Sequence, residues 1–151
     1  MPRYVVHVRS PKSPADAFAY MADLSNFAEW DPGVASVTQI EGDGRGPDAV
    51  FDLEVKGVVG TQTMQYRVTD YHEPTSLTAT STTSVLTSVD VITVTPDEGG
   101  CIVTYDADLT MNGILGIANP VLGLVFNRIG DRAANGLIRV LDGERTGAPT
   151  S

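Results

Sequence analysis

Hydrophobic and polar residues alternate along most of the chain, which is the pattern of strands that bury one face. The first alternating run is at residues 4–9, and six more follow before residue 111. Turn-forming segments rich in Gly, Pro, Asp and Ser separate these runs, and such short connections favour an antiparallel sheet. We predict seven strands, at residues 4–9, 34–41, 49–56, 61–71, 76–83, 88–95 and 101–110.

The spacing of apolar residues changes to that of a helix in two places. After the first strand, Ser13 and Pro14 are residue types typical of an N-cap and a first helical position. We expect two short helices there, ending at the DPG sequence of residues 31–33. After the last strand, apolar residues recur at helical spacing over residues 120–141, which predicts a helix about 33 Å long.

These elements predict an α+β fold in which a strongly curved, seven-stranded antiparallel sheet wraps around the long C-terminal helix. A sheet that buries only one face requires a cover, and the long helix is the one predicted element of matching length. No linker or internal repeat interrupts the order. We therefore expect residues 1–144 to form a single domain and residues 145–151 to form a flexible C-terminal tail.

The charge distribution disfavours several classes of protein. The chain has 19 acidic and 10 basic residues, a net charge of −9, and its basic residues are scattered singly. Binding to nucleic acids depends on clustered basic residues, and so does attraction to an anionic membrane surface. Cys101 is the only cysteine, so no intramolecular disulfide can form. The first residues lack the apolar segment of a secretory signal, and we expect a cytoplasmic protein.

An uncharged segment extends from Leu109 to Asn127. Glycine, asparagine and proline residues interrupt it where a membrane span should be most apolar, so we predict no stable membrane insertion. We expect its first half to connect the last strand to the long helix and its second half to begin that helix. Whether it forms plain core or the wall of a ligand cavity is left open by the sequence. Its apolar residues of interest are Leu115, Ile117, Leu122 and Phe126.

Alternation also predicts which side chains of the strands point inward. Tyr66, Asp90 and Tyr105 are among them, together with apolar neighbours. A desolvated Asp90 would have a raised pKa and act as a base, and the tyrosine hydroxyls would donate hydrogen bonds to a carbonyl or an enolate. The alternative is that both tyrosines are core residues with satisfied hydroxyls and that Asp90 lies at a wet strand end.

Other candidate chemistry is weak. His7, His72 and Cys101 fall on separate elements, so we expect no metal site and no cofactor. Trp30 is either an anchor between the short helices and the sheet or a residue at the mouth of a cavity.

Three sequence segments and the glycine-rich approach to the last helix carry a family resemblance. The segments are SPADAFAYMADLSNFAEWDPGV (13–34), YRVTDYHEPTSL (66–77) and VTPDEGGCIVTYDADL (94–109). They resemble the START-like superfamily, also called Bet v 1-like or SRPBCC, and especially its bacterial polyketide cyclase/dehydrase and lipid-transport branch. The resemblance implies a helix-grip fold, with a cavity between sheet and helix that relatives use for lipids, sterols, aromatic polyketides or plant hormones. Cys101 departs from the family, where Thr is frequent.

The first functional hypothesis is binding or carriage of a small hydrophobic or amphipathic ligand, lipid-like or polyketide-like. The second is a polyketide cyclase, aromatase or dehydratase with Asp90, Tyr66 and Tyr105 as catalytic groups. A third is an interaction protein that uses the fold without a ligand. The residues expected to contact a ligand are Trp30, Phe51, Leu53, Met64, Tyr66, Ile92, Tyr105, Leu115, Ile117, Leu122 and Phe126.

Overall fold

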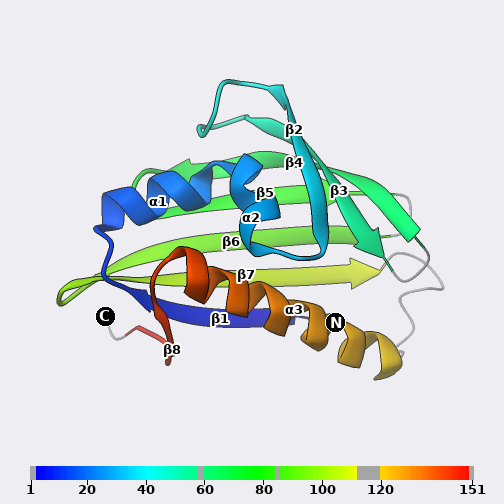
Figure 1. Cartoon of the computed structure of the whole chain (residues 1–151). Helices are drawn as coiled ribbons and strands as arrows, with labels where there is room; N and C mark the ends of the chain where they lie inside the picture. Colours follow the sequence, from blue (N-terminus) through cyan, green and yellow to red (C-terminus); the bar gives the residue numbers. More distant parts are fainter. Residues whose placement is uncertain (1–2, 58–59, 84–85, 112–119, 150–151) are drawn as a thin grey trace.

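The computed structural model describes residues 3–57, 60–83, 86–111 and 120–149 (Figure 1). The strands are β1 (Arg3–Ser10), β2 (Val34–Glu41), β3 (Val50–Gly57), β4 (Gly60–His72), β5 (Ser76–Thr82), β6 (Leu86–Asp97), β7 (Gly100–Met111) and β8 (Glu144–Thr146). The helices are α1 (Pro14–Ala22), the 3-10 helix η1 (Leu24–Asn26), α2 (Phe27–Trp30) and α3 (Pro120–Val140). All seven predicted strands, the short helices and the long helix are present, and the predicted α+β class is confirmed.

The strands form one antiparallel sheet in the order β2-β3-β4-β5-β6-β7-β1-β8. Strands β2 to β7 follow one another as a meander, and β1 pairs with β7, placing Val6 opposite Tyr105. The sheet of the described residues has eight strands rather than the seven predicted. The additional strand, β8, pairs with β1 and places Arg145 opposite Val8. Its last two residues fall in the segment for which the sequence predicts a flexible tail, and three residues are too few for alternation to identify.

The helices begin and end where the sequence predicts. Ser13 caps α1, and its hydroxyl accepts a hydrogen bond from the backbone N–H of Asp16 at 3.1 Å. After α3 the backbone turns through Asp142, which has a φ of 51°. The N–H of Gly143 then donates to the carbonyl of Ile138 at 2.9 Å, which closes the helix end. Among the described residues, no helix combines the length and apolar character that a membrane crossing requires.

The helices lie on one side of the sheet, where the core is (Figure 1). Helix α1 packs on β6 and β7, and α3 packs on β1 and against α2. Two glycines allow α3 to approach closely: a β-carbon at Gly130 would overlap the ring of Tyr4, and one at Gly136 would overlap the carbonyl oxygen of Trp30. Side chains from α3 and its C-terminal end that fill the core are Ala133, Ala134, Leu137 and Leu141.

Candidate functional site

A chain of hydrogen bonds joins four buried side chains on the inner face of the sheet. The Tyr105 hydroxyl donates to Oδ2 of Asp90 at 2.8 Å, and the Ser88 hydroxyl donates to Oδ1 of the same carboxyl at 3.0 Å. The Tyr66 hydroxyl donates to Oγ of Ser88 at 3.0 Å. We call Tyr66, Ser88, Asp90 and Tyr105 the interior network. It connects strands β4, β6 and β7 across the core.

The register of the sheet explains how the network forms. Asp90 lies opposite Ala79 of β5 on one side and Ala107 of β7 on the other. These alanines leave room above the carboxyl for longer side chains. Tyr105 is the diagonal neighbour of Asp90, because it pairs with Ile92. The ring of Tyr66, by contrast, reaches Ser88 across the intervening strand β5.

Burial sets the charge state of the network. Asp90 is 3% exposed, and burial raises the pKa of its carboxyl to about 6, although the hydrogen bonds from Tyr105 and Ser88 favour the ionised form. Burial and the nearby charge of Asp90 also raise the pKa of Tyr105 and Tyr66. The two hydroxyls therefore stay protonated near neutral pH. The carboxyl accepts the hydrogen bond of Tyr105 directly, and Tyr66 is linked to it through Ser88.

Asp31, which follows α2, is a second carboxyl near the network. One of its oxygens accepts a hydrogen bond from the backbone N–H of Gly33 at 2.9 Å. Burial raises the pKa of Asp31, and its charge in turn raises the pKa of Asp90, Tyr66 and Tyr105. From the sequence, Asp31 is recognisable only as part of a helix-ending turn. Strand alternation does not orient a side chain at a helix end, so it gives no signal for this residue.

Trp30 packs directly against the network. Its side chain is 1% exposed, and its ring meets that of Tyr105 edge to face at 5.3 Å between centroids. The centroid of the Phe27 ring lies 4.6 Å from that of the Trp30 ring. The indole Nε1 of Trp30 and the hydroxyl of Ser81, which lies opposite Ser88, are buried without a hydrogen-bond partner in the described part of the chain. The burial and the ring contacts of Trp30 are those of a core residue packed between α2 and the sheet.

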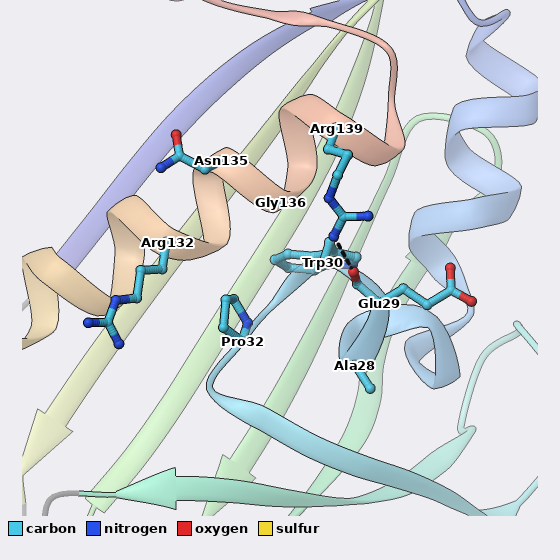
Figure 2. Close-up of a pocket in the computed structure, with 8 residues that line it drawn as sticks. All are labelled: Ala28, Glu29, Trp30, Pro32, Arg132, Asn135, Gly136 and Arg139. Carbon is cyan, nitrogen blue, oxygen red and sulfur yellow. Dashed lines mark hydrogen bonds between the residues drawn. The ribbon is translucent and has the colours of Figure 1, made fainter.

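A surface groove of about 650 Å³ lies between α2 and α3 (Figure 2). The guanidinium of Arg139 donates to the backbone carbonyl of Glu29 at 2.7 Å. Together with the contact between Gly136 and Trp30, this bond holds the two helices together at the groove. Trp30 lines the groove and also contacts Tyr105, so it separates the groove from the interior network. The lining residues are Ala28, Glu29, Trp30, Pro32, Arg132, Asn135, Gly136 and Arg139.

The structure brings the three candidate catalytic residues together. Tyr105 contacts Asp90 directly, and Tyr66 is joined to Asp90 through Ser88. Asp90 is buried rather than at a wet strand end, and both tyrosine hydroxyls are hydrogen-bonded. Leu115 and Ile117 lie outside the described residues. Leu122 and Phe126 lie in α3, and their side chains are outside the described part. The candidate ligand-contacting residues that are described and buried are Trp30, Phe51, Leu53, Met64, Tyr66, Ile92 and Tyr105.

The remaining candidate ligands for a metal stay apart. Within residues 3–57, 60–83, 86–111 and 120–149, no group of three or more His, Cys, Asp or Glu side chains is arranged to hold a metal ion. His7 forms a hydrogen bond with the hydroxyl of Thr104 at 2.8 Å, and His72 contacts Asp70 at 2.9 Å.

Comparison with known families identifies the chain. A family model described as "Polyketide cyclase / dehydrase and lipid transport" matches residues 1–142. The chain belongs to this family. A comparison with curated proteins gives no match.

Solved structures of other proteins share the fold of this chain. A START superfamily protein from Mycobacterium smegmatis superposes with a TM-score of 0.72 at 13% identity, over 93% of this chain and 95% of that one. The Zhui aromatase/cyclase from Streptomyces sp. R1128 gives 0.70 at 14% identity, over 93% and 92%. These likenesses confirm the predicted helix-grip fold.

A third structure is longer than this chain. The di-domain ARO/CYC StfQ from the steffimycin biosynthetic pathway gives a TM-score of 0.68 at 18% identity over 92% of this chain. The match covers 48% of StfQ, so the chain spans about half the length of that protein.

Proposed function

We propose that this protein binds a small hydrophobic or amphipathic molecule, lipid-like or polyketide-like, between the sheet and α3. The single observation that carries the proposal is the interior network. A polar cluster in an apolar core costs desolvation free energy that a wholly apolar core would avoid, and such local violations of packing rules are typical of functional sites. In this proposal the apolar walls supply most of the affinity, and the network fixes the ligand's orientation.

Unpaired donors near the network add support. A buried donor without a partner costs about 1–3 kcal/mol. Among the residues that the structure describes, the indole N–H of Trp30 and the hydroxyl of Ser81 are two such groups. A bound molecule with carbonyl or hydroxyl oxygens would satisfy them. Family membership supports the same class of ligand. We propose a cytoplasmic location as well, which the single, buried cysteine supports.

Trp30 is a convenient reporter for the test, because it is the only tryptophan of the chain and contacts the network. Titration with apolar alcohols and phenols should change its fluorescence saturably, with one molecule bound per chain. Ile40→Ser is the control for binding to exposed apolar surface, since Ile40 is an apolar side chain 50% exposed on β2. Its titration should equal that of the wild type. No saturable change, together with no small molecule retained from cell extract by mass spectrometry, would refute the proposal.

The second candidate function is cyclase, aromatase or dehydratase activity, and the position of Asp90 favours it. A base with a pKa of about 6 suits proton abstraction near neutral pH. In this proposal the ionised carboxyl takes a proton from a carbon next to a substrate carbonyl. The electrons of the C–H bond form an enolate, which accepts a hydrogen bond from a tyrosine hydroxyl. The enolate carbon attacks a second carbonyl, and the new alkoxide takes the proton back from Asp90.

Enzyme kinetics separate this function from simple binding. With a poly-β-ketone substrate, the wild-type kcat should fall as pH drops below about 6, because the base becomes protonated. Asp90→Asn should lower kcat by at least about 100-fold, whereas the substrate affinity should change little. Turnover by Asp90→Asn at the wild-type rate would exclude the role of Asp90 as a base.

A further inference from the structure

The basic side chains of this protein all lie outside its core, whereas one acidic side chain, Asp90, is buried in it. Every Lys, Arg and His residue of the sequence falls within the described ranges, and none of them is buried. The uncharged segment from Leu109 to Asn127 supplies no basic side chain to the interior either. Two arginines, Arg132 and Arg139, line the outer groove (Figure 2). Basic groups are therefore available only at the surface.

The interior, in contrast, contains a buried carboxyl, and a half-buried one lies near it. Asp90 is buried in the hydrogen-bonded network, and Asp31 interacts with it electrostatically from the end of α2. Each Asp90 oxygen accepts one hydrogen bond from the protein, from Tyr105 or from Ser88. A carboxylate oxygen has room for a second hydrogen bond, so Asp90 has acceptor capacity left for a ligand.

A ligand placed beside the network therefore meets negative charge without a compensating cation. A carboxylate or phosphate group there would lose its hydration and lie next to a like charge, which is unfavourable on both counts. A hydroxyl, phenol or ammonium group would instead donate a hydrogen bond to Asp90, and charge-assisted bonds of this kind are the stronger ones.

We propose that the interior site selects ligands with a neutral or cationic hydrogen-bond donor, namely alcohols, phenols and amines, and rejects carboxylates and phosphates. This inference rests on the proposed binding function. It divides the lipid-like candidates: sterol-like and phenolic molecules fit the site, and ionised fatty acids do not. The apolar walls alone would not make this distinction, because they contact only the hydrocarbon part of a ligand.

Three probes with one hydrocarbon chain test the selection: decanol, decylamine and decanoate. Their affinities are measured at pH 7.5 by Trp30 fluorescence and by calorimetry, below the concentrations at which they aggregate. Decanol and decylamine should bind, and decanoate should bind at least about 10-fold more weakly than decanol, as expected for a desolvated like-charge contact. Asp90→Asn should reduce the gap between decanol and decanoate.

Asp43→Asn is the control for charge, because it makes the same change of charge at an exposed loop residue. Its ranking of the three probes should be that of the wild type. Decanoate binding to the wild-type protein as tightly as decanol would overturn the inference and leave the proposed function intact. An unchanged gap in affinity between decanol and decanoate in a folded Asp90→Asn protein would overturn it as well. Failure of all three probes to bind would overturn the proposed function, and the inference with it.

Discussion

Replacing Asp90 with asparagine should change how the stability of this protein depends on pH. The substitution removes a buried ionisable group but keeps an oxygen that accepts the hydrogen bond from Tyr105. In the wild type, burial raises the pKa of Asp90 from 3.8 to about 6. The folded protein therefore holds a proton that the unfolded chain releases at lower pH. Wild-type stability falls as pH rises between these two values, and the loss is complete above the folded pKa.

The size of the effect follows from the two pKa values. A difference of about two pKa units corresponds to a free energy of about 3 kcal/mol, at 1.36 kcal/mol per unit. Most of it, about 2 kcal/mol, develops between pH 4 and pH 8. Asp90→Asn lacks this loss. Its free energy of unfolding, relative to that of the wild type, should rise by about this amount over that range.

Urea denaturation at several pH values, followed by the fluorescence of Trp30, measures the difference. All other titrating groups are common to both proteins and largely cancel, and Asp31 is the neighbouring carboxyl whose charge affects Asp90 most. Asp43→Asn should give a curve parallel to that of the wild type, because its side chain is exposed. If the Asp90→Asn and wild-type curves are also parallel from pH 4 to pH 8, Asp90 keeps its ordinary pKa in the folded protein, and the reasoning is refuted.

Three further substitutions test the packing, a cap and the network. Gly136→Ala should lower the free energy of unfolding by about 3 kcal/mol or more, because the new methyl group overlaps the Trp30 carbonyl. Ser13→Ala should cost about 1 kcal/mol in the same denaturation assay, since it removes the α1 cap. Tyr105→Phe should cost about 1–3 kcal/mol and raise the pKa of Asp90 further, by removing one of its donors. The carboxyl shift in an NMR titration reports that pKa.

The controls for these substitutions follow from the same contacts. A β-carbon at Gly147 would meet nothing within 4 Å, so Gly147→Ala should leave stability within about 0.5 kcal/mol of the wild type. Equal stability of Gly136→Ala and the wild type would contradict the close contact of α2 and α3. A pKa of Asp90 that does not rise in Tyr105→Phe would show that this hydroxyl does not stabilise the ionised carboxyl.

The sequence was sufficient for the fold because each strand carries its own alternation and each helix its own boundary residues. Parity placed Asp90 and Tyr105 on the inner face without knowledge of their neighbours. The same parity applies to Ser88, two residues before Asp90, so this member of the network was accessible from the sequence and was overlooked. Only the structure shows that these side chains meet.

Contacts between strands could not be predicted, because the sequence of a single strand does not specify how that strand aligns with its neighbour. Tyr66 reaches Ser88 only with β4, β5 and β6 in their observed alignment, which includes an irregularity between Val68 and Asp70. Asp31 was missed for a related reason. Its approach to the network depends on how α2 packs on the sheet, and a four-residue helix has too few positions for a periodic pattern.

The place of β1 in the sheet determines when the fold can be completed. The first strand of the chain pairs with β7 and β8, and Arg3 lies opposite Asp108, more than a hundred residues away. During synthesis, β1 therefore has neither of its partner strands until β7, which ends at Met111, has been made. Contacts of such long sequence separation slow folding, because a large loop must close before they form. Premature termination before β7 would leave β1 with two unpaired edges, which are sites for aggregation.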